Sequence, residues 1–71
     1  MKIKVKPIDQ IINNFKKFDV ILDENAIKEW DRYAGKEFTV KVKNGPFEIT
    51  TYVIQDDGFK GDMLTESEIE M

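Results

Sequence analysis

The amino-acid sequence predicts a mainly β fold with two short helices, an α+β arrangement of the small barrel or roll kind. Polar and apolar residues alternate strictly over residues 2–6 and again over 37–43, which predicts strands buried on one face. Asn44-Gly45 follows the second stretch and is a strong hairpin signal, because a type I′ turn needs positive φ at both central residues. Two segments with apolar residues three and four positions apart predict the helices.

The first strand and the first helix follow each other directly. In the strand over residues 2–6, Ile3 and Val5 point to one side and three lysines to the other. Pro7 ends this strand, because it has no N–H to donate to a neighbouring strand but fits the first turn of a helix. We expect that helix over residues 7–18. Its apolar face consists of Ile8, Ile11, Ile12, Phe15 and Phe18.

The second helix is predicted between a capping aspartate and a glycine. Residues 20–22 before it form a short apolar strand or an extended link. Asp23 is the expected N-cap, since its carboxylate can accept from the exposed backbone N–H groups of the first turn. Gly35 lies where a C-terminal cap requires positive φ. The apolar face consists of Ala26, Ile27, Trp30, Tyr33 and Ala34, and Trp30 on it is expected to be a core anchor.

The remaining strands are expected to surround the hairpin. The strand over 37–43 pairs with a return strand over 47–54, and Pro46 is tolerated only where its missing N–H falls at an unpaired position. A second turn over 56–58 precedes Phe59, which could begin a short last strand, and a turn that packs Met63 and Leu64. Residues 65–71 are expected to form an acidic flexible tail.

The chain is expected to form a single domain over residues 1–71, near the lower size limit for one hydrophobic core. It contains no cysteine, so disulfides cannot support that core. The predicted core consists of Ile3, Val5, Ile12, Phe15, Trp30, Phe38, Val40 and Ile49.

Composition argues against catalysis. Without histidine or cysteine there is no imidazole base and no thiolate nucleophile, and the single serine, Ser67, lies among acidic residues. A calcium loop at Asp56 or Asp57 is excluded, because Gly58 and Phe59 stand where oxygen ligands are needed. We therefore predict no enzyme activity, no metal site and no cofactor. No apolar run approaches the roughly 20 residues of a membrane helix, so no membrane partner is expected.

The lysines of the predicted strands offer two interpretations. If the strands over 2–6 and 39–43 are neighbours, five ammonium groups converge on one face and could attract a phosphate backbone. The alternative is that they protect an edge strand against aggregation, which the net charge of −3 favours. The five residues are Lys2, Lys4, Lys6, Lys41 and Lys43.

The chain resembles a group of short proteins common in Firmicute phages and prophages. The matching pieces are "MKIKVKPIDQII", "ILDENAIKEWDRYAGKEFTVKV", "YVIQDDGF" and "DML". This resemblance implies a small SH3-like β-barrel, a location in the cytoplasm of a bacterial host, and no catalytic residues. The chain departs from the group after Gly58, where its relatives carry two or three consecutive aromatic residues and only Phe59 stands here.

Together these features predict a non-catalytic phage or prophage accessory protein that acts by binding a host or phage protein. A sharper form is inhibition of a host enzyme or defence system, with the acidic end imitating nucleic-acid phosphates. The alternative is a nucleic-acid-binding module that uses the lysine faces. The predicted contact surface has an apolar part of Phe47, Tyr52 and Phe59 and a charged rim of Asp56, Asp57 and Asp62. Burial of Phe47 and Phe59 in the core remains the competing expectation.

Overall fold

The structure is a computed structural model that describes residues 1–45, 47 and 49–70. Within these residues the chain forms five strands, two α-helices and the short 3-10 helix η2. In chain order the elements are β1 (Lys2–Val5), α1 (Ile8–Lys17), α2 (Glu24–Asp31), β2 (Glu37–Asn44), β3 (Thr50–Ile54), β4 (Met63–Thr65), η2 (Glu66–Glu68) and β5 (Ile69–Glu70).

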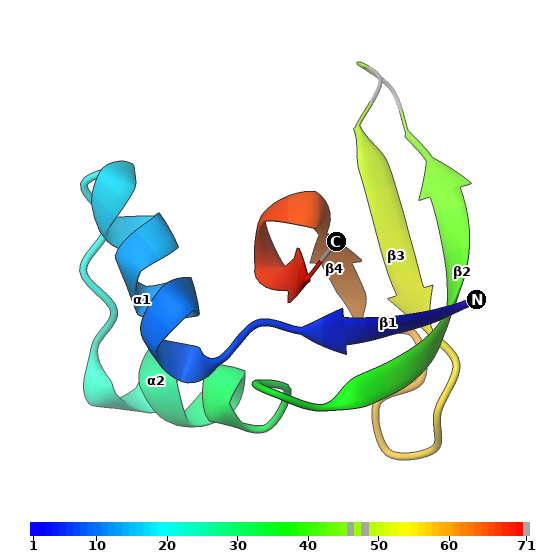
Figure 1. The fold of residues 1–71 in the computed structure, drawn as a ribbon, viewed down its shortest axis with the longest axis horizontal. Helices are drawn as coiled ribbons and strands as arrows, with labels where there is room; N and C mark the ends of the chain where they lie inside the picture. The colour runs from blue at the N-terminus through cyan, green and yellow to red at the C-terminus, as the bar shows by residue number, and fades with distance from the viewer. Residues whose placement is uncertain (46, 48, 71) are drawn as a thin grey trace.

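The five strands form one antiparallel sheet that curls into a half-barrel (Figure 1). The strand order is β4-β3-β2-β1-β5. Strand β2 serves both halves of the sheet, because residues 37–39 pair with β1 while residues 40–44 pair with β3. Strand β5 pairs with the other edge of β1, so the first and last strands are neighbours. The arrangement confirms the predicted mainly β fold with two short helices.

The two helices lie together beside the sheet, in the connection between β1 and β2 (Figure 1). Pro7 is the N-cap of α1, so the helix begins one residue later than predicted. The Oδ1 atom of Asp23 accepts a hydrogen bond of 2.8 Å from the Ala26 N–H, which confirms the predicted N-cap of α2. Gly35 has the expected positive φ of 72°, four residues beyond the end of α2. Neither helix of the described chain is long and apolar enough to span a membrane.

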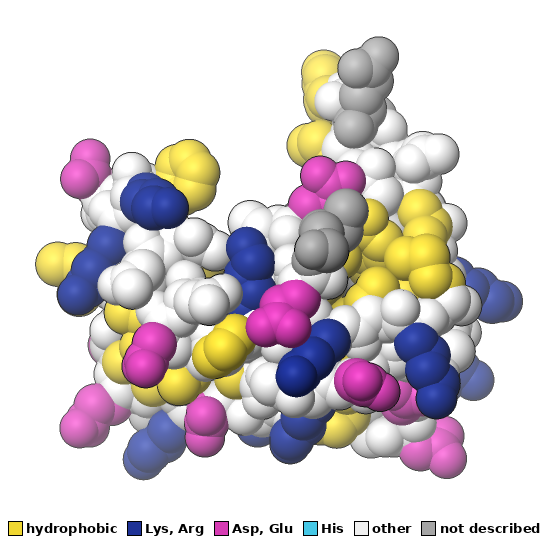
Figure 2. Space-filling view, viewed as in Figure 1, with side chains coloured by type: hydrophobic (Ala, Val, Ile, Leu, Met, Phe, Trp, Pro, Cys, Tyr) yellow, Lys and Arg dark blue, Asp and Glu magenta, His cyan; other side chains and the backbone are white. Residues whose placement is uncertain are grey.

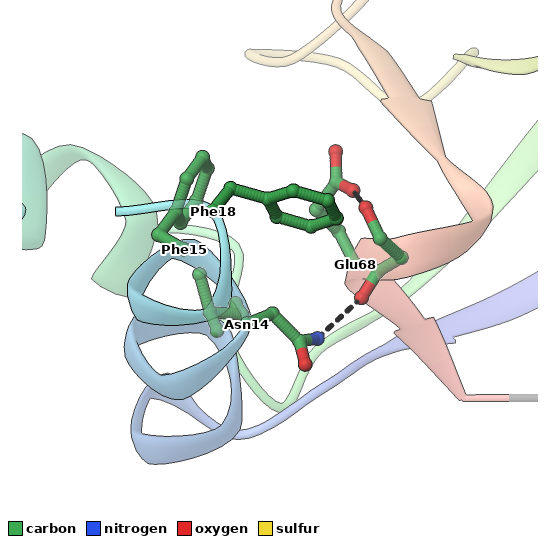
Figure 3. Close-up of a pocket in the computed structure, with 6 residues that line it drawn as sticks. Asn14, Phe15, Phe18 and Glu68 are labelled. Atoms are coloured by element: carbon green, nitrogen blue, oxygen red, sulfur yellow. Dashed lines mark hydrogen bonds between the residues drawn. The ribbon is translucent and has the colours of Figure 1, made fainter. Parts of the chain in front are cut away.

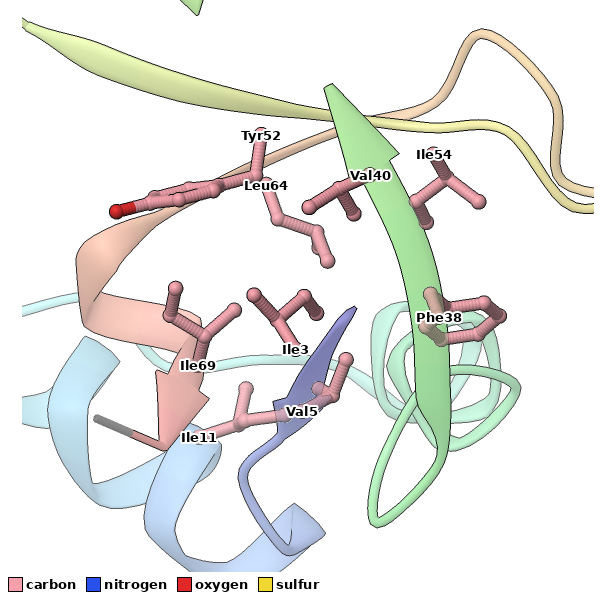
Figure 4. Close-up of a cluster of buried hydrophobic side chains, with 9 residues drawn as sticks. All are labelled: Ile3, Val5, Ile11, Phe38, Val40, Tyr52, Ile54, Leu64 and Ile69. Carbon is pink, nitrogen blue, oxygen red and sulfur yellow. The ribbon is translucent and has the colours of Figure 1, made fainter. Parts of the chain in front are cut away.

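Buried hydrophobic side chains fill the concave side of the half-barrel (Figure 4). They come from every strand and from α1. The buried cluster consists of Ile3, Val5, Ile11, Phe38, Val40, Tyr52, Ile54, Leu64 and Ile69. Full burial of one such side chain stabilises a fold by about 1.5–3 kcal/mol, so this cluster is the main source of stability. The predicted core positions in β1 and in the first half of β2 are confirmed.

Five aromatic rings continue the core toward the helices, and we call them the aromatic ladder. The ladder consists of Phe15, Trp30, Tyr33, Phe38 and Phe59. Ring centroids are 5.7 Å apart for Phe15 and Trp30, 6.0 Å for Trp30 and Tyr33, and 5.2 Å for Tyr33 and Phe59. Phe15 and Trp30 therefore pack against the core as predicted, but both are only half-buried.

Two further predicted core residues, Ile12 and Ile49, belong neither to the buried cluster nor to the partly buried side chains packed against it. Helix α1 turns Ile11 inward, which leaves Ile12 only half-buried. Ile49 is 54% exposed, because β3 begins only at the next residue and the β2–β3 hairpin projects beyond the core (Figure 1). Val42 points to the same concave side as Val40 yet is exposed for the same reason.

The β2–β3 connection differs from the predicted two-residue turn. Neither Asn44 nor Gly45 has positive φ, whereas Phe47 has a φ of 64°. A turn centred on Asn44-Gly45 would put Pro46 at the first position of the return strand, where its missing N–H weakens the pairing. The connection instead takes up more residues, so the return strand is shorter than predicted. Residues 46 and 48 lie outside the described part of the chain.

The last strands also differ from the prediction. Phe59 lies in a turn, so that β4 begins only at Met63, whereas residues 20–22 form a link without regular secondary structure, one of the two expected alternatives. The expected flexible tail over 65–71 is wrong for residues 65–70, which complete β4 and form η2 and β5. Ile69 is 1% exposed, and burial of this one apolar side chain holds the acidic segment against the core. Residue 71 lies outside the described part.

Candidate protein-binding site

The predicted contact surface is divided between two ends of the molecule. Phe47 is 92% exposed in the connection at one end of the β2–β3 hairpin. The β3–β4 connection, which carries Asp56, Asp57, Phe59 and Asp62, lies at the opposite end of β3 (Figure 1). The six predicted residues therefore do not form one surface.

Two of the three predicted aromatic contacts are packed against the core. Tyr52 is 5% exposed and lies opposite Leu64 in the sheet, with its ring at the edge of the buried cluster (Figure 4). Phe59 is half-buried against the rings of Tyr33 and Phe38, so the competing core interpretation is correct for Phe59. Alternation along a strand assigns Tyr52 and Val53 to opposite faces, but it does not say which face is buried.

Two of the predicted rim carboxylates hold the fold together. The Oδ2 atom of Asp56 accepts a hydrogen bond of 3.1 Å from the backbone N–H of Thr39. The Oδ2 atom of Asp62 accepts one of 2.5 Å from the Tyr33 hydroxyl. That hydrogen bond, together with burial, raises the pKa of Tyr33 above its ordinary value. Asp57 is exposed.

The five predicted lysines do not form one uninterrupted basic surface. Lys4 lies between Glu37 and Glu70, which are its register partners on the two neighbouring strands. Lys6 follows the end of β1 and lines a shallow polar pocket with Lys17 on α1. Only Lys2, Lys41 and Lys43 remain on the convex face without an acidic register partner.

The 3-10 helix η2 lies between α1 and the hairpin, and the sequence prediction missed it. A capping box holds it: the Glu68 carboxylate accepts from the Thr65 N–H at 3.3 Å and from the Thr65 hydroxyl at 2.5 Å. The Ser67 hydroxyl also donates to the Glu68 carboxylate. The T-x-x-E spacing of residues 65–68 is a recognised sequence signal for such a box. The exposed side chains of Glu66 and Ser67 therefore stand on a braced turn.

A first groove separates η2 from α1 (Figure 3). It is small, with a volume of about 40 Å³, and its lining is mostly apolar. The Asn14 side-chain amide crosses it and donates to the Ser67 carbonyl at 2.9 Å. The Phe18 ring reaches from the end of α1 toward Glu68 and is 76% exposed (Figure 3). The lining consists of Ile11, Asn14, Phe15, Phe18, Ser67 and Glu68.

A second groove of about 280 Å³ lies on the other side of η2, against the hairpin. Ile49 and Thr50 form its outer wall, and Ser67 lines it as well as the first groove. We call this region the η2 face and define it by Phe18, Ile49, Thr65, Glu66 and Ser67. Figure 2 shows the helices and the hairpin rising on either side of a hollow, with hydrophobic side chains on both.

The η2 face combines exposed apolar and polar side chains. Its polar groups are the hydroxyls of Thr65 and Ser67 and the carboxylate of Glu66, without an imidazole or thiol. In the described residues, no three His, Cys, Asp or Glu side chains are grouped so that they could hold a metal ion. Comparison with known protein families, curated proteins and solved structures finds no match for the chain.

Proposed function

We propose that the chain is a non-catalytic binding protein whose protein partner docks on the η2 face. One observation carries this proposal: two grooves share Ser67 and are bounded on their outer sides by the exposed apolar side chains of Phe18 and Ile49. A partner that crosses η2 would contact both grooves at once. Aromatic residues, phenylalanine among them, are enriched at the cores of protein–protein interfaces.

Hydrogen bonds order the η2 face before any partner binds, which favours docking. Hydrogen bonds to Glu68 brace η2, and Asn14 links η2 to α1, so little ordering is required when a partner binds. Binding to such a pre-ordered surface avoids part of the entropic cost of association. Glu66 adds an exposed negative charge in the middle of the face, which would set the orientation and salt dependence of docking.

We also propose that the half-barrel is an SH3-like barrel. This proposal is supported by the bent strand β2, which serves both halves of the sheet, and by the pairing of the first strand with the last. Small barrels of this kind host many unrelated functions, so the fold alone does not identify the partner.

The biological setting that we propose is a phage or prophage accessory protein in a bacterial cytoplasm. Its support is the sequence resemblance described above. In that setting the partner would be a host or phage protein, and inhibition of a host enzyme or defence system is the sharper form of the proposal. In such inhibition, the Glu66 carboxylate on the η2 face would occupy a site where the partner otherwise binds a nucleic-acid phosphate.

A capture experiment with matched variants tests the proposal. The tagged chain and its Phe18→Ser and Ile49→Ser variants are used to capture proteins from a lysate of the organism that encodes the chain. We expect a partner whose recovery falls by about tenfold or more in both variants, as for residues central to an interface. Ile21→Ser is the control, because Ile21 is exposed but lines neither groove. Equal recovery with all variants, or no specific partner, would reject the η2 face.

A further inference from the structure

A third groove lies between α2 and β4, apart from the η2 face. Its volume is about 260 Å³, which is below the range of about 300–1,000 Å³ for pockets that enclose whole small molecules. The size suits one long side chain rather than a cofactor. The groove is lined by Glu29, Trp30, Tyr33, Asp62, Met63 and Leu64.

The walls of this groove are apolar and aromatic. Trp30 is half-buried, and its ring packs against Phe15 at a centroid distance of 5.7 Å and against Tyr33 at 6.0 Å. Leu64 is fully buried, whereas Met63 beside it is 64% exposed. Trp30 lines the groove, and tryptophan is the aromatic side chain that attracts a cation most strongly.

The charges of this groove are negative. Glu29 and Asp62 bring two carboxylates, and none of the six lining residues is basic. Each carboxylate already accepts one hydrogen bond, Glu29 from Arg32 at 3.1 Å and Asp62 from Tyr33 at 2.5 Å. A carboxylate has about four acceptor positions, so both can accept more.

The aromatic ladder already binds cations at its other end. The Arg32 guanidinium lies 5.3 Å from the centre of the Phe59 ring and 5.8 Å from that of Tyr33, and the Lys36 ammonium lies 5.8 Å from that of Phe59. The chain thus covers one end of the ladder with its own basic side chains. At the Trp30 end, the groove offers a ring and two carboxylates without a basic side chain among its lining residues.

We propose that the α2–β4 groove binds one arginine or lysine side chain of a partner protein. The cationic head would lie against the Trp30 ring and beside the carboxylates of Glu29 and Asp62, and the aliphatic stem would cover the exposed side chain of Met63. This site is separate from the η2 face and does not depend on the partner that docks there.

The test uses the chain alone and a matched pair of small probes. Acetyl-arginine amide is titrated into the ¹⁵N-labelled protein, and amide and indole NMR shifts are followed together with the fluorescence of Trp30, the sole tryptophan. Acetyl-citrulline amide is the neutral probe, because citrulline has nearly the same shape without the charge. We expect millimolar binding of the arginine probe, with shifts confined to residues around the groove, and no saturable shift with citrulline.

Three variants distinguish specific binding in the groove from non-specific electrostatic attraction of the arginine probe to an acidic protein. Glu29→Gln and Asp62→Asn should each weaken arginine binding by up to about fivefold, the upper end for an exposed charge pair. Asp57→Asn removes an exposed acid outside the groove and should leave binding unchanged. Asp62 also accepts a hydrogen bond from Tyr33, so Asp62→Asn can disturb the fold. If Asp62→Asn is unfolded, the result for Glu29→Gln decides the test. Equal shifts with both probes, shifts away from the groove, or unchanged binding in Glu29→Gln would overturn the proposal.

Discussion

Trp30 lies between Phe15 and Tyr33, near the end of the aromatic ladder away from Phe59, and its contribution to stability can be measured directly. Its ring packs between Phe15 and Tyr33, but it is only half-buried, so its loss should cost less than that of a fully buried aromatic. We expect Trp30→Ala to lower the free energy of unfolding by about 2–3 kcal/mol. Urea denaturation measures this change. Phe18→Ala is the control and should stay within about 0.5 kcal/mol of the parent, because Phe18 is mostly exposed. A Trp30 variant as stable as the parent would contradict the packing described here.

The hydrogen bond between Tyr33 and Asp62 makes a second residue-scale prediction, on pH. This bond, with burial, raises the pKa of Tyr33 above the ordinary value of about 10. The contribution to stability is therefore complete below about pH 10 and is lost as the pH rises through the folded-state pKa. We expect Tyr33→Phe to be less stable than the parent by about 1 kcal/mol at neutral pH. Denaturation at several pH values should show this difference shrinking in alkaline solution, and a difference that stays constant would refute the assignment.

At the scale of elements, the C-terminal strand β5 decides whether the acidic end belongs to the fold. Ile69 is almost fully buried between β1 and the rest of the core, so Ile69→Ala should cost about 2–4 kcal/mol. The total stability expected for a domain of this length is about 4–10 kcal/mol, so the loss would be easy to detect by denaturation. Glu70→Ala changes an exposed neighbour and should be nearly neutral. An Ile69→Ala variant as stable as the parent would contradict the packing of the acidic C-terminal segment against the core.

The features that were predicted correctly from the sequence are those determined by residues close together in the chain. Alternation identifies β1 and β2, and the Asp23 cap and the positive φ of Gly35 follow from the chemistry of one or two residues. The sequence-based predictions are wrong where contacts between residues far apart in the chain determine the structure. The burial of Ile69 depends on pairing with a strand more than sixty positions earlier in the chain, and no local pattern in "TESEIE" indicates it.

The candidate site was harder to predict than the fold, for the same reason. Phe18, Ile49 and Ser67 come from three separate segments, and only the curvature of the sheet brings their grooves together. The T-x-x-E capping box was the one available local signal for η2. Tyr52 was placed on the surface because alternation does not reveal which face of β3 the half-barrel encloses.

At the scale of the whole molecule, the charge pattern predicts weak nucleic-acid binding. Of the five lysines predicted to contact nucleic acid, Lys2, Lys41 and Lys43 are the three on the sheet without an acidic register partner, and the net charge of the chain is −3. We expect no affinity tighter than about 10⁻⁵ M near physiological salt, in the range of non-specific contacts. Fluorescence anisotropy with labelled duplex and single strands measures it. Replacing these three lysines by serine should remove residual binding, whereas Lys4→Ser should not, because Lys4 lies between two glutamates. Submicromolar, sequence-dependent binding would favour the nucleic-acid alternative.

The central claim is that the η2 face is where this protein meets another protein. Photo-crosslinking in the cells that produce the chain tests this most directly, with a benzophenone amino acid at position 67 or, as a matched control, at position 57. Ser67 and Asp57 are both exposed and polar, but only Ser67 lines the two grooves. We predict a discrete crosslinked protein from position 67 and none from position 57. Crosslinking from position 57 but not from position 67, or from neither, would contradict the claim.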